Sequence, residues 1–122
     1  MTLHESGEMY LESILVMQRG GARVRSVDLA EHMQFSKPSV SRAVGLLKNG
    51  GYITVDKDGT LFLTDLGREI AQKTYDRHTT LTDFFIALGV DPAVAVNDAC
   101  KIEHCISDET FAALKQHIAL QA

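Results

Sequence analysis

Two short β-rich runs interrupt an otherwise helical chain, and they limit the fold more than any other feature. Residues 52–55 and residues 60–63 consist mainly of β-branched, aromatic and aliphatic side chains. The four residues between them, Asp-Lys-Asp-Gly, are typical of a tight turn. The two runs and the turn predict a β-hairpin that separates a helical segment before it from a helical segment after it.

Three helices are predicted ahead of the hairpin. Apolar residues at helical spacing indicate a first helix over residues 3–18, which ends before a Gly-Gly pair. A short second helix begins at Ser26, a candidate N-cap. The third helix begins after Ser36, another candidate N-cap, carries Pro38 in its first turn and runs to about residue 49.

Three more helices are predicted after the hairpin. Thr64 caps a long helix that runs to about residue 88, and two shorter helices follow over residues 91–105 and residues 107–120. Three helices, a hairpin and a further helix are the element order of a winged helix. We therefore expect a mainly α fold with a two-stranded wing, in which a winged helix-turn-helix domain is followed by a helical domain.

Charge is divided unevenly along the chain. The formal net charge of −4 by itself argues weakly against nucleic-acid binding. Basic residues outnumber acidic ones between Arg19 and Lys57, however, whereas acidic residues outnumber basic ones from His78 to the end. The predicted domains, residues 1–70 and residues 71–122, therefore suit different ligands: phosphates for the first domain and a cation for the second.

The sequence has the features of a cytoplasmic protein rather than of a membrane or secreted one. Its longest apolar stretch, residues 84–90, is far shorter than the roughly 18 residues of a membrane span. The N-terminus lacks the basic segment and apolar core of a signal peptide. Cys100 and Cys105 are too few for a disulfide framework, and on a helix they point in different directions, so we expect reduced thiols.

The start of the predicted third helix carries small hydroxyl groups and basic side chains. Val40, Val44 and Leu47 are spaced to face the core, which leaves the hydroxyl and basic groups outward. An exposed helix N-terminus of this composition suits phosphate and base-edge contacts in a DNA major groove, although the segment alone also fits a solvated surface helix. The predicted DNA-binding residues, which include the hairpin tip, are Ser36, Lys37, Pro38, Ser39, Ser41, Arg42 and Lys57.

A group of metal-ligating residue types stands near the end of the chain. Cys100, Glu103 and His104 occupy positions i, i+3 and i+4, so they share one face of the predicted helix over residues 91–105. A thiolate, a carboxylate and an imidazole form a transition-metal donor set. The spacing fits equally well a half-buried cysteine, a surface glutamate and a hydrogen-bonded histidine. Cys105 falls on another face, where we expect a small buried apolar residue.

Six segments of the chain are similar, in order, to motifs of one known family. The chain resembles the iron-dependent repressors, the family of the diphtheria toxin repressor and MntR-like metalloregulators, over nearly its whole length. The segments are residues 8–14, 36–41, 63–68, 77–78, 97–104 and 106–109. The resemblance implies a metal-responsive transcriptional regulator, in a short form without the C-terminal SH3-like domain of the longer iron-type members.

The resemblance also implies a primary metal site. In iron-type members this site uses Met, Cys, Glu and His at the positions of Met9, Cys100, Glu103 and His104, whereas manganese-type members have Asp and Glu in place of the first two. Without the resemblance, Met9 on its apolar stripe would be interpreted as a core methionine. The implied donor set favours Fe²⁺ as the divalent cofactor and leaves Mn²⁺ as an alternative.

A second metal site is implied by the manganese-type members. Its acidic and histidine ligands match Glu12, His78 and Glu103, all of which are present. The second site of the iron-type members is poorly matched, because Thr82 stands in place of a Glu and Val96 in place of a His. The chain thus resembles a hybrid of a manganese-type length and an iron-type primary site.

Together these features predict a homodimer that binds a palindromic operator in double-stranded DNA and is activated by a divalent metal. The apolar residues of the last two helices favour pairing with a second copy. Met9 and Glu12 lie on the first helix and the other ligands in the dimerisation region, so one cation can fix the reading domain. Such a protein regulates, and most simply represses, genes of iron or manganese homeostasis.

Two other interpretations stay open. A winged-helix regulator that responds to a small molecule or an oxidant, without metal, would bind DNA with an affinity that a chelator does not change. A metalloenzyme could use Cys100, Glu103 and His104, but the sequence has no His-Glu-x-x-His pattern and no nucleophile with a supporting base. We therefore expect a protein that is not an enzyme.

Overall fold

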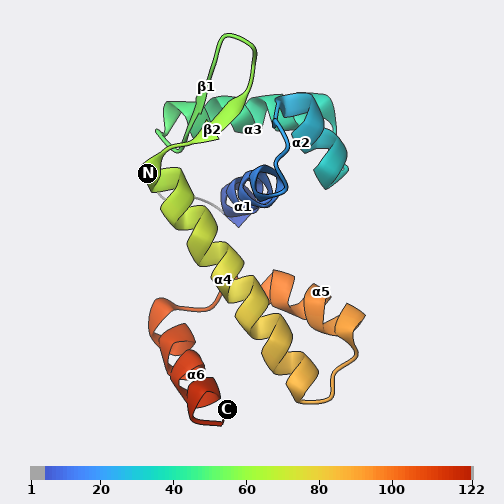
Figure 1. Cartoon of the computed structure of the whole chain (residues 1–122), viewed down its shortest axis with the longest axis vertical. Helices are drawn as coiled ribbons and strands as arrows, with labels where there is room; N and C mark the ends of the chain where they lie inside the picture. The colour runs from blue at the N-terminus through green and yellow to red at the C-terminus, as the bar shows by residue number, and fades with distance from the viewer. Residues whose placement is uncertain (1–4, 122) are drawn as a thin grey trace. The chain divides into compact units, whose positions relative to one another are not determined.

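The structure is a computed structural model that describes residues 5–121, and these residues form six helices and one two-stranded antiparallel sheet (Figure 1). The predicted mainly α fold with a two-stranded wing is confirmed, while the predicted helix start at Leu3 lies outside the described residues. Two compact units are formed, one up to Lys73 and one from Thr74 onwards. The elements are α1 (Glu5–Arg19), α2 (Ser26–Met33), α3 (Lys37–Asn49), β1 (Ile53–Val55), β2 (Leu61–Leu63), α4 (Asp65–Ala87), α5 (Pro92–Ile102) and α6 (Asp108–Gln121).

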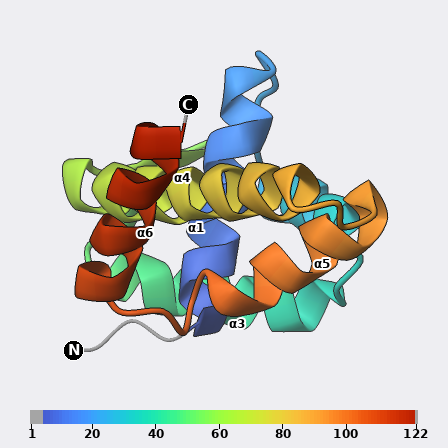
Figure 2. The same ribbon diagram turned by 90° about the horizontal axis from the view of Figure 1, so that it is seen from below.

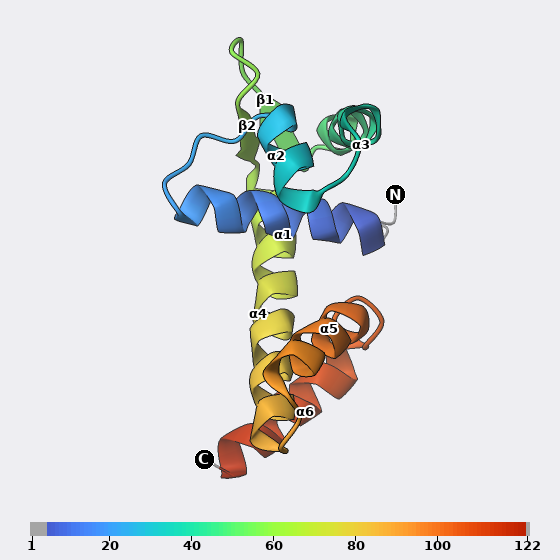
Figure 3. The same ribbon diagram turned by 90° about the vertical axis from the view of Figure 1, so that its right-hand side faces the viewer.

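In the first unit, α1, α2 and α3 pack together and the hairpin of β1 and β2 joins them (Figure 3). The side chains that fill the core are apolar and come from all three helices and both strands. Burying each such side chain contributes about 1.5–3 kcal/mol, so the core holds these short helices in place more than their own helical propensity does. Each of the following exposes at most 1% of its surface: Leu11, Ile14, Val24, Leu29, Val40, Ile53 and Leu61.

Helices α3 and α4 begin at the predicted caps. Ser36 Oγ accepts a hydrogen bond from the backbone N–H of Ser39 at 3.3 Å, and Pro38 lies in the first turn, where a missing N–H costs little. Thr64 Oγ1 accepts a hydrogen bond from the backbone N–H of Gly67 at 3.1 Å. Each cap satisfies an N–H group that has no partner within its own helix and contributes about 1 kcal/mol.

The start of α2 differs from the prediction. Arg25, and not Ser26, is the N-cap residue, and its backbone N–H donates to the carboxylate of Asp28 at 3.0 Å. Arg25 is held in an extended conformation because it forms an antiparallel β-bridge with Thr60 of the hairpin. A contact with a distant part of the chain, rather than a local serine cap, therefore sets where α2 begins.

The hairpin has a regular register and a turn closed by one carboxylate. Strands β1 and β2 pair antiparallel, with Thr54 opposite Phe62. Asp56 Oδ1 accepts hydrogen bonds from the backbone N–H groups of Asp58 and Thr60, at 2.9 Å and 2.8 Å. The aspartate thus organises the turn at the tip of the wing, as aspartate side chains commonly do in turns.

In the second unit, α5 and α6 pack against the C-terminal half of α4 (Figure 1), and Figure 2 shows the two helices apart from each other along α4. Leu81 of α4, Ala99 of α5 and Phe111 of α6 form the buried centre, and each exposes at most 8% of its surface. Phe85 and Ile106 pack against this centre and are partly buried. The small core fixes α5 and α6, and with them the turn that links the two helices, against α4.

Helix α5 ends earlier than predicted, at Ile102 instead of residue 105. Glu103 keeps the helical hydrogen bond from its N–H to the carbonyl of Ala99 at 2.9 Å, but the N–H of Cys105 bonds to the nearer carbonyl of Ile102 at 2.8 Å. This tighter turn leads the chain away from the helix axis. It leaves the side chain of Cys105 exposed, so the prediction that Cys105 is buried is wrong.

Helix α4 is the longest helix that the structure describes, with 23 residues. Charged residues recur along it, among them Arg68, Asp76 and Asp83. Neither α4 nor any other helix within residues 5–121 is both long and apolar enough to cross a membrane.

Gly67, in the first turn of α4, lies against the backbone just before β1. A Cβ atom on Gly67 would lie 2.0 Å from the carbonyl oxygen of Tyr52, and a backbone oxygen cannot rotate aside as a side chain can. We expect Gly67→Ala to lower the free energy of unfolding by about 1–3 kcal/mol, which is the usual cost of overpacking. Urea denaturation followed by circular dichroism measures the change.

Gly45→Ala is the matched control. Gly45 lies within α3, and no described atom outside its own surroundings comes within 4 Å of an added Cβ. The same substitution should here raise the free energy of unfolding by up to about 1 kcal/mol, because alanine favours a helix over glycine. Equal stabilities of Gly67→Ala and the wild type would contradict the close packing of α4 on the turn before β1.

Candidate metal centre and nucleic-acid interface

Helix α3 turns the predicted DNA-reading residues away from the core. Val40, Val44 and Leu47 are buried, which confirms the predicted inward face. Ser39 is half-buried, and the other candidate residues at the start and on the outer face of the helix are exposed. The exposed residues are Ser36, Lys37, Pro38, Ser41 and Arg42.

Two hydroxyl groups order the N-terminus of α3. Ser36 Oγ accepts from the backbone N–H of Ser39 and donates to Ser39 Oγ at 2.8 Å. The exposed side chains of Lys37 and Arg42 add positive charge to the end of the helix that already carries the positive pole of its dipole. This end of α3 can therefore bind phosphate oxygens and reach the edges of bases.

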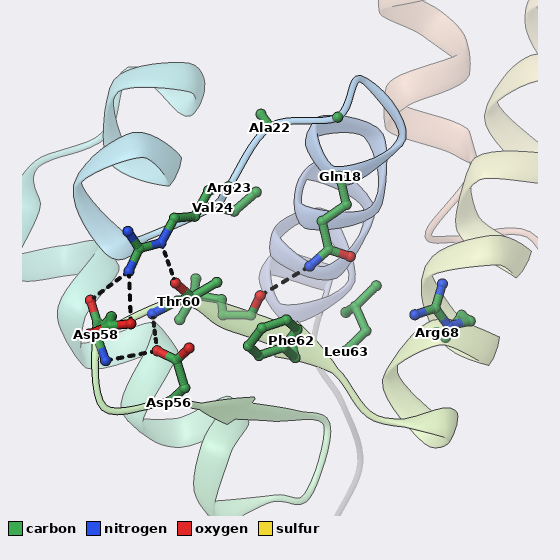
Figure 4. A pocket seen from close by; sticks show the side chains of 12 residues that line it. Gln18, Ala22, Arg23, Val24, Asp56, Asp58, Thr60, Phe62, Leu63 and Arg68 are labelled. Atoms are coloured by element: carbon green, nitrogen blue, oxygen red, sulfur yellow. Dashed lines mark hydrogen bonds and ion pairs between the residues drawn. The ribbon is translucent and has the colours of Figure 1, made fainter.

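Lys57 lies at the exposed tip of the wing, between two acidic residues that are engaged elsewhere. The carboxylate of Asp56 accepts backbone hydrogen bonds within the turn. Asp58 forms an ion pair with Arg23 at 3.6 Å, and Arg23 Nε also donates to Thr60 Oγ1 at 2.5 Å (Figure 4). The Lys57 ammonium group is thus left on the surface, where a phosphate can approach it.

A cleft of about 510 Å³ separates part of the wing from the end of α1 (Figure 4). Residues that line it are joined by hydrogen bonds: Gln18 Nε2 donates to the carbonyl of Leu61 at 3.0 Å, and the N–H of Leu61 donates to the carbonyl of Val24 at 2.8 Å. Together with Arg23 these contacts tie the wing to the helices. No role for Arg23 was expected from the sequence, because a single basic residue in a loop carries no sign of its partners.

A buried carboxylate forms the centre of the predicted metal-binding region. Glu103 exposes only 1% of its surface. Its Oε2 lies 2.8 Å from His78 Nδ1, and its Oε1 lies 3.2 Å from His104 Nε2. The packing of α5 on α4 brings these residues together, because His78 belongs to α4 and His104 to the turn after α5. The two oxygens of one carboxylate thus face two different histidines.

The surroundings of Glu103 fit a divalent cation. Its Oε1 atom is buried and makes no hydrogen bond with the residues that the structure describes, although His104 is near. A buried polar atom without a hydrogen bond typically lowers the free energy of unfolding by about 1–3 kcal/mol. Carboxylate and imidazole are both donors to divalent transition metals, so a cation beside Oε1 would remove this cost. The residues present therefore suit the predicted metal.

The other predicted ligands are spread over both units. Cys100 is half-buried on α5, and in the described part of the second unit its thiol forms no compact donor group with Glu103 and His104. The prediction that these three residues share one helix face is wrong for His104, which lies in the turn after α5. Met9 and Glu12 lie on α1 in the first unit, and both are half-buried.

Arg77 is a residue of the second unit for which the sequence indicated no separate role. It is buried, and its guanidinium group reaches the turn that follows α5. Its position directly before His78 was part of the family resemblance, but a charged residue on a long helix is expected on the surface. Burial of the arginine could therefore not be predicted from the local sequence.

Two family models match consecutive parts of the chain. The model described as the iron dependent repressor, N-terminal DNA binding domain, matches residues 2–61. The model described as the iron dependent repressor, metal binding and dimerisation domain, matches residues 64–119. The first match ends within the wing and the second begins just before α4, so the two together cover nearly the whole chain.

Individual proteins show the same relationship. The transcriptional regulator MntR of Escherichia coli is 34% identical over 106 residues, which are 87% of this chain and 68% of MntR. The diphtheria toxin repressor of Corynebacterium diphtheriae is 32% identical over 111 residues, which are 88% of this chain and 48% of that protein. The structure of the manganese regulator SloR matches with a TM-score of 0.83 and 26% identity, over 98% of this chain and 55% of that chain.

This chain thus spans about half to two thirds of the length of these three proteins. The match includes the winged helix, with its exposed start of α3, and the helical unit that buries Glu103. Because the chain matches both domains of the family in the expected order, it belongs to the iron-dependent repressor family.

Proposed function

We propose that this protein is a metal-dependent DNA-binding regulator of transcription, which represses genes of iron or manganese homeostasis. One observation carries the proposal: the buried carboxylate of Glu103 faces His78 and His104 in the unit that matches the family's metal binding and dimerisation domain. A purely structural domain is often at least as stable with apolar residues in place of such a buried polar cluster. A metal-responsive protein needs the cluster.

The first unit reads DNA in this proposal. The start of α3 enters the major groove, where the guanidinium group of Arg42 can donate two hydrogen bonds to one base. The hydroxyl groups and lysines bind phosphates or base edges around it. The proposed DNA-contacting residues are Ser36, Lys37, Pro38, Ser39, Ser41, Arg42 and Lys57.

Two ligand sets are proposed, and they share Glu103. The contacts of its two oxygens support this division, because Oε1 lies 3.2 Å from His104 Nε2 and Oε2 lies 2.8 Å from His78 Nδ1. A bound divalent cation would supply the positive charge that a buried carboxylate requires. The proposed ligands are Met9, Cys100, Glu103 and His104 for the primary site, and Glu12, His78 and Glu103 for the second.

The proposed ligands connect metal binding to DNA reading. Met9 and Glu12 lie on α1, which packs against α2 and α3 and so belongs to the rigid reading unit. The remaining ligands lie in the second unit. Metal binding then favours conformations in which the ligands of both units bind the same cation. The DNA affinity rises only to the extent that these conformations bind metal more tightly than the remaining conformations do.

The second unit is proposed to pair with a second copy. Leu88, Val94 and Val96 expose 66%, 50% and 44% of their surfaces, and covering apolar surface contributes about 25 cal/mol per Å². A homodimer places two α3 helices on successive turns of a palindromic operator. In this proposal residues 1–70 form the DNA-binding domain, residues 71–122 form the metal-binding and dimerisation domain, and the protein acts in the cytoplasm.

The activating metal is proposed to be Fe²⁺, with Mn²⁺ as the alternative. The sulfur atoms of Met9 and Cys100 are soft donors, whereas Mn²⁺ prefers harder carboxylate oxygens. SloR, whose structure is similar, is described as a manganese regulator. The proposed preference for iron therefore rests on the donor chemistry of these two residues.

Metal-dependent DNA binding tests the proposal. A duplex selected from a random library by the metal-loaded protein serves as operator, and fluorescence anisotropy measures its binding anaerobically with Fe²⁺, with Mn²⁺ and with a strong chelator. We expect binding with metal and loss of binding with chelator. Arg42→Ala should weaken binding by about 1–3 kcal/mol, the contribution of one good base contact, and leave metal affinity unchanged.

Lys115→Gln is the control, because it removes one positive charge from α6 in the other unit. Its operator affinity should equal that of the wild type. Equal affinity with metal and with chelator would contradict the proposal and favour a metal-independent winged-helix regulator. An Arg42→Ala protein that loses metal but keeps DNA would show that DNA is read elsewhere.

Glu103→Gln separates metal binding from folding. The amide keeps the shape of the side chain and an oxygen that can accept a hydrogen bond from His78, so the variant should still fold in chelator, and its free energy of unfolding there is the reference for its gain with metal. With metal at 100 times the wild-type dissociation constant, the free energy of unfolding of the wild type should rise by about 2.7 kcal/mol. That of Glu103→Gln should rise far less. Glu109→Gln, at an exposed position of α6, should keep the wild-type gain. A full gain in Glu103→Gln would show that Glu103 is not a ligand.

Met9→Asp combined with Cys100→Glu tests the choice of metal. The wild type should respond to Fe²⁺ at a lower free concentration than to Mn²⁺, and the double variant should narrow or reverse this ratio because both sulfur donors are gone. Activation midpoints are measured by anisotropy on operator DNA, with circular dichroism and size-exclusion chromatography to verify fold and dimer. An unchanged ratio would favour Glu12 and His78 as the sensing ligands.

A further inference from the structure

Arg77, on α4, is a buried cation that holds the turn between α5 and α6 at several points. It exposes only 7% of its surface. Its Nη1 donates hydrogen bonds to the carbonyl of Glu103 at 3.1 Å and to the carbonyl of Ile106 at 2.6 Å. Its Nη2 donates to the carboxylate of Asp108, and its guanidinium carbon lies 5.3 Å from the centre of the Phe111 ring.

The carbonyl groups that Arg77 binds belong to the turn after α5: Glu103 directly follows the helix, and Ile106 lies near the end of the turn. Helix α5 ends at Ile102, and the carbonyl groups at a helix C-terminus have no N–H partner within the helix. A positive side chain near this end also interacts favourably with the helix dipole. Arg77 therefore supplies, from another helix, donors to the carbonyls of the turn and a positive charge near the end of α5.

Glu103 is held by two consecutive residues of α4. Arg77 binds its carbonyl oxygen at 3.1 Å, while His78 Nδ1 lies 2.8 Å from its carboxylate. The first contact fixes the backbone of Glu103, and the second fixes the direction of its side chain. His104 is the next residue of the same turn, so the contact of Arg77 with the turn also limits where the His104 imidazole can lie.

We propose that Arg77 is a positioning residue of the metal centre: it fixes the turn so that Glu103 and His104 present their ligand atoms in one arrangement before a cation binds. This inference rests on the proposed metal-dependent function. Residues that hold metal ligands in place typically contribute about 10- to 100-fold to metal affinity. Arginine suits the task because its planar group binds two carbonyls and a carboxylate at once, whereas lysine offers a single charged point.

A purely structural Arg77 would leave a different signature. Loss of its hydrogen bonds would then lower the free energy of unfolding, but the molecules that stay folded would bind metal with wild-type affinity. For a positioning residue, the affinity of the folded protein itself falls, and a lysine in place of the arginine restores part of it. Metal affinity and stability therefore have to be measured separately.

Titration of the full chain with Co²⁺, followed by its visible absorption and by competition with a chelator, tests the proposal. Arg77→Gln should bind Co²⁺ about 10- to 100-fold more weakly than the wild type, and Arg77→Lys should lie between the two. Urea denaturation in chelator gives the folded fraction of each variant. Lys115→Gln is the matched control: Lys115 also lies over the Phe111 ring, at 5.7 Å, but its described hydrogen bond goes to Asp76.

Each outcome decides the matter. Wild-type Co²⁺ affinity in folded Arg77→Gln would overturn the inference and leave the proposed function standing. If Arg77→Gln does not fold, Arg77→Lys decides: weaker Co²⁺ binding supports the inference, and wild-type binding overturns it. If the wild type binds no Co²⁺, the proposed metal dependence fails, and the inference fails with it.

Discussion

The contact of the Glu103 carboxylate with two histidines is the interaction on which the second unit depends. A carboxylate with 1% exposure has lost nearly all contact with water, and one of its oxygens makes no hydrogen bond with any residue that the structure describes. Such burial is unfavourable unless a positive partner is present. His78 Nδ1 lies 2.8 Å from one oxygen and His104 Nε2 lies 3.2 Å from the other, and the proposed cation would add the positive charge.

Each of the two units contains an arginine that binds a turn distant from it in sequence. Arg23 binds Asp58 and Thr60, and so steadies the wing that presents Lys57. Arg77 binds the turn after α5 and so steadies Glu103. In both units the functional side chain lies in an irregular segment, whose position cannot come from helix or sheet hydrogen bonds alone. The fold compensates with long-range contacts, which come from the loop before α2 in the first unit and from α4 in the second.

The order of helices and strands could be predicted from periodicity and caps, because each depends on residues close in sequence. Features set by distant contacts could not. Arg25 replaces Ser26 as the cap of α2 because it pairs with the hairpin, and Cys105 is exposed because α5 ends early in a turn without a glycine or proline signal. The proximity of His78 to Glu103 depends on how α5 packs on α4, so only the family resemblance could bring the two together in advance.

Anomalous diffraction from crystals grown with Mn²⁺ or Co²⁺ tests most directly whether the buried carboxylate is the metal centre. We expect an anomalous peak at about 2.0–2.2 Å from an oxygen of Glu103, with a nitrogen of His104 or His78 among the other ligands. Occupied metal sites found only at surface carboxylates, with no peak beside Glu103 and with both histidines still against its carboxylate, would contradict a metal centre in this unit.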